Sequence, residues 1–173
     1  MNEISLTTQL QQCQLEVAEL KNTVLELTDF FENASLPIHG VNGSGIIIWA
    51  NKEELDFMGY DRDEYVGKHI SNFHADKVSI DDLLARLIKK QTVKNYPAQL
   101  ILKSGEIKPV LINSNVYQVG DKFVHTRCFT RDITELKKSE AIKVEVIAEL
   151  HQQMRQLKEQ NAFLKNKLLE LSR

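Results

Sequence analysis

Two adjacent carboxylates, Asp81 and Asp82, are the residues of this sequence whose types and spacing most resemble an acid–base pair. Neighbouring residues of a helix point in different directions, and both acids follow Ser79 in a segment with the pattern of a helix start. Ser79 is the predicted N-cap, and two acids in the first turn suit the positive end of the helix dipole. Helix capping therefore explains this pair better than general acid–base catalysis does.

The two cysteines, Cys13 and Cys128, are the other chemically versatile residues, and they lie in segments of different character. Their spacing fits no metal site, so we expect two reduced thiols in apolar surroundings. The sequence has no glycine-rich phosphate loop, zinc pattern or nucleophile elbow. We therefore expect no catalytic residues, no metal site and no enzymatic activity.

The chain is organised around the stretch 122–135, KFVHTRCFTRDITE. Bulky residues alternate with small ones from Phe123 to Phe129, which predicts a strand with two different faces. From Asp132 the period changes, because Asp is a good helix N-cap, Glu135 follows in capping-box position, and no Gly or Pro occurs afterwards. A strand is thus predicted to continue directly into a helix of roughly forty residues, about 60 Å long.

Composition and charge narrow the class of protein. The net charge of −2 is unevenly spread: residues 1–33 carry −5, residues 137–173 carry +3, and residues 34–136 balance at thirteen charges of each sign. Spread bases of this kind do not suit a nucleic-acid-binding surface. No apolar run reaches the ~18 residues needed to cross a bilayer, and the first residues lack the features of a signal peptide. We expect a cytoplasmic protein that binds neither nucleic acid nor membrane.

The N-terminal segment has a heptad repeat, which predicts a parallel two-stranded coiled coil because β-branched Val at a with Leu at d favours that assembly. The alternative is one amphipathic helix lying on its own domain. The repeat runs through Leu6, Leu10, Cys13, Val17, Leu20, Val24, Leu27 and Phe31.

The C-terminal segment has a second heptad repeat, with Asn161 at one a position. A polar Asn in an apolar seam costs stability but pairs with its symmetry mate, and so selects a parallel, in-register dimer. The alternative is a long helix that docks on another protein. The repeat runs through Ile147, Leu150, Met154, Leu157, Asn161, Leu164, Leu168 and Leu171.

Between these segments the pattern predicts an α+β domain. Residues 33–45, with one Pro and three Gly, form turns, and 45–50 form a strand. A short helix over 52–57 is capped by Asn51 and ended by Gly59. A longer helix covers 79–90, and strands at 95–103, 107–118 and 123–130 form an antiparallel meander of two hairpins. We predict about five antiparallel strands with short helices on one face.

The order of several short motifs resembles a PAS domain of the sensory-box type over roughly residues 24–136. The motifs are Ala50-Asn51, Met58-Gly59-Tyr60, Gly67-Lys68-His69-Ile70, Lys103-Ser104-Gly105-Glu106 and Asp132-Ile133-Thr134. In that family the final Asp-Ile-Thr links the sheet to an output helix. The resemblance implies that Thr126, Cys128 and Thr130 line a ligand cavity, and that Phe123, His125 and Phe129 lie on the outer sheet face, against the N-terminal helix or a partner subunit.

Departures from better-known members of the family limit the cofactors. The Asn-Cys-Arg-Phe-Leu motif of light-oxygen-voltage domains is absent, so a flavin bonded to cysteine is not expected. Haem is not expected either, because the helix over 79–90 has no His, while His69 and His74 lie in a polar turn where exposure or hydrogen bonding is commoner than ligation. His151 begins HQQMRQ, which does not resemble the phosphoacceptor motif of sensor kinases. Any ligand is unknown from sequence.

The resulting prediction is a cytoplasmic, homodimeric PAS sensor with a coil over 1–32, a PAS domain over 33–134 and an output coil over 135–173. It would pass a change in the core through Asp132, Ile133 and Thr134 to the C-terminal coil and a downstream signalling protein. The dimer residues would be Leu10, Val17, Leu20, Val24, Leu27, Leu150, Leu157, Asn161 and Leu164. The alternatives are a ligand-free PAS scaffold, or the sensory fragment of a histidine kinase or cyclase.

Overall fold

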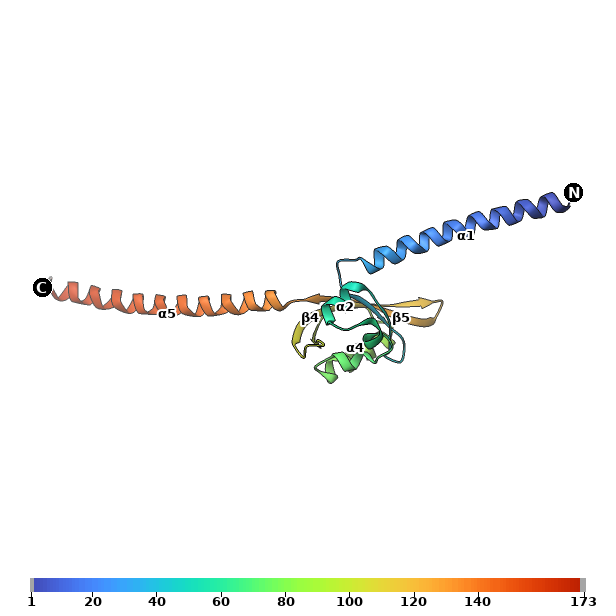
Figure 1. Ribbon diagram of the computed structural model, residues 1–173. Coiled ribbons are helices and arrows are strands. Elements are labelled where there is room, and N and C mark those ends of the chain that lie inside the picture. The colour runs from blue at the N-terminus through green and yellow to red at the C-terminus, as the bar shows by residue number, and fades with distance from the viewer. Residues whose placement is uncertain (1, 172–173) are drawn as a thin grey trace. The chain divides into compact units, whose positions relative to one another are not determined.

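The computed structural model describes residues 2–171, which form two compact units that divide between Asp132 and Ile133. The first unit begins with helix α1 (Asn2–Glu32) and continues into a sheet with short helices. The second unit is helix α5 (Thr134–Leu171) (Figure 1). Both flanking segments are thus long helices, as their heptads predicted.

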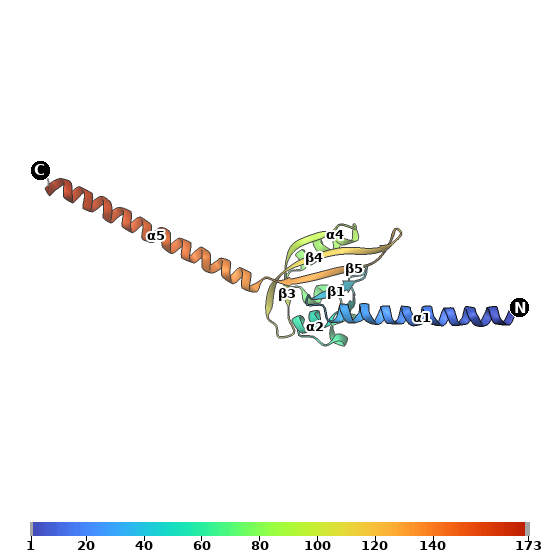
Figure 2. The same ribbon diagram turned by 90° about the horizontal axis from the view of Figure 1, so that it is seen from above.

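The five strands form one antiparallel sheet in the order β2-β1-β5-β4-β3. They are β1 (Ile38–Val41), β2 (Ile47–Ala50), β3 (Val93–Ile101), β4 (Ile107–Val119) and β5 (Lys122–Asp132). The central strand β5 lies between β1 and β4 (Figure 2). The predicted α+β fold with a five-stranded antiparallel sheet is confirmed, and so is the meander of the last three strands.

Four short helices connect β2 to β3 and pack against one face of the sheet (Figure 1). They are α2 (Lys52–Met58), α3 (Arg62–Tyr65), the 3₁₀ helix η1 (Ile70–Phe73) and α4 (Lys77–Ile88). The core between helices and sheet contains Val41, Ile47, Met58, Tyr65, Phe73, Leu83, Leu87, Val110 and Ile112.

Helix α2 begins and ends at residues whose types explain its limits. The Asn51 side chain accepts a hydrogen bond from the Glu54 N–H, as an N-cap does. Gly59 has φ of 76°, a left-handed conformation that glycine adopts without strain, and its N–H bonds the Leu55 carbonyl. The sequence prediction of this helix and both its caps is confirmed.

Helix α4 begins earlier than predicted. Its N-cap is Asp76, which accepts a hydrogen bond of 2.9 Å from the Val78 N–H, so Ser79 is not the cap. The predicted cap was wrong because an Asp three residues upstream competes for the same role. Asp81 and Asp82 consequently lie beyond the first turn, and Asp82 bonds Arg86 and the hydroxyl of Tyr96.

A β-bulge near the β4–β5 turn moves Phe123 to the opposite face from that predicted. Tyr117 pairs with His125 but Gln118 pairs with Phe123, so Val124 is an additional residue and the alternation shifts by one. Phe123 therefore lines a pocket on the helix side of the sheet. His125 keeps the predicted outer face, where its ring packs on Trp49 at 5.4 Å.

Candidate functional site

The inner face of β5 carries small polar side chains that are almost fully buried. Thr126, Cys128 and Thr130 have exposed fractions of 2%, 4% and 1%. Thr126 Oγ1 accepts a hydrogen bond from the Val41 N–H at 3.1 Å, and Cys128 Sγ lies 3.0 Å from Ser114 Oγ and 3.3 Å from Thr126 Oγ1. The three residues thus point inward together, while their role as a ligand pocket stays a prediction.

A buried ion pair lies beside this face. His39 of β1 is the direct strand partner of Cys128, and its Nδ1 lies 2.8 Å from Oε1 of Glu54, a residue of α2 with no exposed surface. The Tyr65 hydroxyl of α3 donates a hydrogen bond of 2.6 Å to the same Glu54 oxygen. One carboxylate therefore joins a strand and two helices inside the core.

The electrostatics of the pair favour its charged form. Burial lowers the pKa of His39, but the neighbouring Glu54 carboxylate and Cys128 outweigh burial and raise that pKa to about 10. Burial raises the pKa of Glu54, and the His39 imidazolium outweighs this, so the carboxyl pKa is lowered. The pKa of Tyr65 is raised by burial and by Glu54, which keeps its hydroxyl a donor. The attraction between two buried charges offsets their desolvation only when additional hydrogen bonds of this kind support them.

The ion pair was missed by sequence reasoning. Glu54 stands three residues after the cap Asn51, where a Glu normally reaches back to the helix N-terminus at the surface. His39 lies in a four-residue strand within a segment that was predicted to be turns. His39 lies next to Cys128 only because β1 pairs with β5. A pattern of neighbouring residues in the sequence does not predict such long-range pairing.

A pocket of about 220 Å³ opens at one end of the inner face. Leu84, Leu87 and Phe123 form its apolar part, and Thr126 and His69 contribute polar atoms. The backbone N–H of Ser71 donates a hydrogen bond of 3.3 Å to His69 Nδ1. Of the three predicted pocket residues, Thr126 lines this pocket, whereas Cys128 and Thr130 are not among its lining residues.

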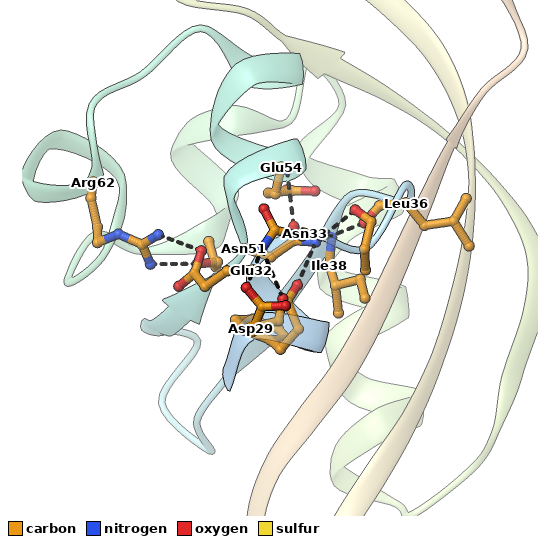
Figure 3. Close-up of polar contacts among 11 residues, drawn as sticks. Asp29, Glu32, Asn33, Leu36, Ile38, Asn51, Glu54 and Arg62 are labelled. Carbon is orange, nitrogen blue, oxygen red and sulfur yellow. Dashed lines mark hydrogen bonds and ion pairs between the residues drawn. The ribbon is translucent and has the colours of Figure 1, made fainter. Parts of the chain in front are cut away.

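Asn51 connects the core to the end of α1. Its Oδ1 accepts hydrogen bonds from the N–H groups of Ile38 and Glu54, and its Nδ2 donates to the carbonyls of Phe31 and Leu36, at 2.9–3.2 Å (Figure 3). The side chain is completely buried. One amide therefore ties α1, β1 and α2 together, and it does so next to the backbone of the buried Glu54.

Two further contacts fasten the end of α1. Arg62 pairs with Glu32 at 2.9 Å and also donates to the Ala50 carbonyl (Figure 3). Phe31 packs edge-on against Trp49, with ring centroids 5.2 Å apart. The last turn of α1 is thereby attached to the outer face of the sheet.

The predicted junction residues follow one another at the end of β5. Asp132 is the last strand residue and pairs with Lys108 of β4 at 3.2 Å, so it fastens the end of the strand. Helix α5 begins at Thr134, two residues after Asp132. Capping by the Asp132 carboxylate stays a prediction.

The predicted seam residues of both long helices are solvent-exposed in the single chain. Leu10, Leu20 and Leu27 are 60–64% exposed, and Leu150, Leu157 and Leu164 are 53–57% exposed. Val17 and Val24 of α1 lie in the same exposed seam at 49% and 61%. Asn161 is likewise exposed on α5. Each helix thus presents an apolar stripe that its own chain leaves uncovered.

The two histidines considered for haem occupy different environments. His69 is half-buried beside the pocket, and its Nδ1 lies 2.6 Å from Ser71 Oγ. His74 is buried, and its pKa is lowered to about 4 by burial and by the charge of His39. Within residues 2–171, His, Cys, Asp and Glu form no group of three that could hold a metal ion.

A family model described as PAS domain matches residues 35–135. The chain therefore belongs to the PAS domain family, as its motifs indicated. No curated protein matches the sequence. None of the helices in the described part of the chain combines the length and the apolar character that crossing a membrane requires.

Solved structures share the fold at low sequence identity. The PAS domain of an HTR-like protein from Haloarcula marismortui is 20% identical with a TM-score of 0.62, and the match covers 69% of this chain and 99% of that chain. A PAS domain from a two-component sensor histidine kinase is 12% identical with a TM-score of 0.55, covering 66% and 98%. An RNA-binding light-oxygen-voltage receptor is 16% identical with a TM-score of 0.63, covering 70% of this chain and 36% of the receptor.

Proposed function

We propose that this PAS protein is a homodimeric signal-transduction module whose core state is passed through Asp132, Ile133 and Thr134 to a C-terminal coiled coil. The observation that carries the proposal is the direct continuation of β5, the central strand, into a 38-residue helix with an exposed apolar seam. A strand that shifts at its end turns the first residues of such a helix, and a long helix carries that change along its length.

The dimer rests on the exposed seams. Burying leucines at roughly 25 cal/mol per Å² of apolar surface favours association of both coils. A groove on α1 formed by Cys13, Val17, Ala18 and Lys21 follows the predicted seam, and holes of this kind receive side chains of a second helix in coiled coils. The partner we propose is therefore a second copy of the chain, and a downstream signalling protein would read the C-terminal coil. Nucleic acid and membrane are not among the proposed partners.

Ligand sensing would use the pocket beside Thr126. Its volume of about 220 Å³ and its mixed lining suit a small, partly apolar molecule.

We assign no catalytic role to the chain. The competing function is a PAS scaffold that sets dimer geometry without a ligand. A third possible function is that of the sensory part of a larger kinase. It is supported by the similarity of the fold to the PAS domain of a two-component sensor histidine kinase.

The assembly is tested at Asn161. Wild-type protein should be a parallel dimer at micromolar concentration, and Asn161→Leu should raise the thermal stability of the coil while admitting higher oligomers or antiparallel pairs, because the pairing constraint is lost. Analytical ultracentrifugation and cross-linking measure both properties. Asn166→Leu is the matched control, since position 166 lies outside the predicted seam. A monomeric wild type would contradict the dimer, and a variant that stays strictly parallel and dimeric would show that Asn161 does not set the register.

The relay is tested by combining a core substitution with a junction substitution. Thr126→Val removes the hydroxyl that bonds Val41, and hydrogen exchange along residues 136–171 measures how far α5 responds. Asp132→Ala removes the pairing with Lys108 and the predicted cap, at a cost of about 1 kcal/mol, comparable to the ~1–3 kcal/mol that usually couples two sites. We expect the response of α5 to Thr126→Val to shrink when Asp132 is replaced.

The control for this experiment is Asp121→Ala, in the β4–β5 turn, which should leave the response unchanged. If α5 responds equally to Thr126→Val with and without Asp132, the junction is only a tether. The scaffold function would then be preferred to the relay.

A further inference from the structure

The thiol of Cys128 is buried in the core, yet its neighbours are polar side chains. Three polar side chains surround it: Ser114 at 3.0 Å, Thr126 at 3.3 Å, and His39, its partner across the β1–β5 ladder. His39 is held on its other side by Glu54, 2.8 Å from Nδ1. In space, the His39 imidazole therefore lies between the Cys128 thiol and the Glu54 carboxylate. In this order the carboxylate keeps the imidazole protonated, and the imidazolium favours the thiolate.

The electrostatics agree with this geometry. Burial raises the pKa of Cys128, but the His39 charge and the two hydroxyl groups outweigh it, so the thiol pKa is lowered. The other titratable groups of the cluster do not counteract the lowering of the thiol pKa. Tyr65 keeps its proton because its pKa is raised, and His74 is neutral because its pKa is lowered to about 4.

We propose that Cys128 is a modification site that hydrogen peroxide oxidises to sulfenic acid within the folded core. The thiolate attacks one peroxide oxygen, so an S–O bond forms as the O–O bond breaks. The leaving hydroxide takes the proton of the His39 imidazolium and departs as water. The sulfur is oxidised by two electrons and the peroxide is reduced by two. An added thiol condenses with the sulfenic acid to a mixed disulfide and water, and a second thiol then releases reduced Cys128.

The size of the reactant follows from burial. With 4% of its surface exposed, Cys128 is closed to bulky reagents, whereas hydrogen peroxide is close to water in size. The added oxygen must be placed between Ser114, Thr126 and His39, which would disturb the pairing of β1 with β5. That consequence for signalling rests on the proposed function, but the oxidation itself does not.

The test uses the full chain with Cys13→Ser, so that Cys128 is the only thiol. The protein is exposed to hydrogen peroxide for short times, quenched and unfolded, and the remaining thiol is alkylated and quantified by mass spectrometry. At pH 6 we expect folded Cys128 to react at least ~10-fold faster than the same thiol in the urea-unfolded chain, because an ordinary thiol is then almost fully protonated. Its rate should rise less steeply between pH 6 and 8 than that of the unfolded chain, which gains about tenfold per pH unit, because the thiol pKa is lowered in the folded protein.

The variant His39→Gln should slow the folded reaction about tenfold and restore the rise with pH, and His151→Gln on α5 is the matched control. If folded Cys128 reacts more slowly than the unfolded thiol, or if both rates rise with pH in parallel, the proposal is overturned. This comparison needs no substitution in the core. The signalling relay could fail its own test while Cys128 still oxidises, so the two failures are distinguishable.

Discussion

Replacing Glu54 with alanine should lower the free energy of unfolding by about 3–5 kcal/mol, the range measured when one partner of a buried ion pair is removed. The substitution leaves the His39 imidazole without its carboxylate and the Tyr65 hydroxyl without its acceptor. Urea unfolding followed by the fluorescence of Trp49, the single tryptophan, measures the effect on the PAS domain. A change of this size would account for a large part of the stability of an ordinary domain.

The adjacent residue provides the control. Glu53 belongs to the same turn of α2 but is exposed, so Glu53→Ala should change the free energy of unfolding by less than about 0.5 kcal/mol. A Glu54→Ala variant as stable as Glu53→Ala would mean that the pair contributes no net stability. The double substitution of His39 and Glu54 would then show whether the two side chains interact at all.

Sequence reasoning succeeded where the signal was local. The heptads predicted both long helices, because an apolar stripe at helical spacing depends only on neighbours along the chain. Asn51 and Gly59 predicted the limits of α2 for the same reason, since a cap bonds its own helix. The strand pattern predicted the two hairpins of the meander, whose strands follow one another along the chain.

Prediction from the sequence failed where two local signals competed, or where segments far apart in the chain come together. Ser79 and Asp76 are both good caps, and only the structure shows that Asp76 begins α4. The bulge at Val124 shifts the alternation of β5, so the strand pattern placed Phe123 on the wrong face. The inward direction of Thr126, Cys128 and Thr130 came from the resemblance to the family, because Thr is more often exposed than buried in folded proteins.

Asn51 shows why a correct local prediction can still miss the main role of a residue. Its cap on α2 was predicted, but its amide also bonds Phe31 and Leu36, which lie 15–20 residues earlier in the chain. Glu54 follows the same logic, because its backbone belongs to the predicted cap while its carboxylate pairs with His39. The first turn of α2 therefore links the buried ion pair to the end of α1.

Acid should destabilise the PAS domain through His74. This histidine is buried, and its pKa in the folded protein is lowered to about 4 by burial and by the charge of His39. The ordinary value near 6.5 applies to the unfolded chain, so between pH 6.5 and 4 the unfolded state binds a proton that the folded state does not. The stability that neutral His74 contributes is complete above pH 6.5 and is lost as the pH falls toward 4.

The size of this effect follows from the two pKa values. Each pH unit between them is worth about 1.4 kcal/mol, so His74 should account for a loss of roughly 3 kcal/mol between pH 6.5 and 4. The lowered pKa of Glu54 acts in the same direction, but its contribution is lost only as the pH falls below the ordinary carboxyl value of 4.5. Wild-type protein should therefore unfold at clearly lower urea concentration at pH 4 than at pH 7.

The variant His74→Gln isolates the histidine contribution. It should be less stable than wild type at pH 7, because a buried amide replaces a packed imidazole. Its stability should fall less between pH 7 and 4, since only the contributions of the carboxyls with lowered pKa remain. Urea unfolding at both pH values, at one fixed chain concentration, measures the difference. His151→Gln on the exposed face of α5 should follow the wild-type curve. If wild type and His74→Gln lose the same stability on acidification, His74 is already charged or solvated in the folded protein, and acid sensitivity must come from the carboxylates alone.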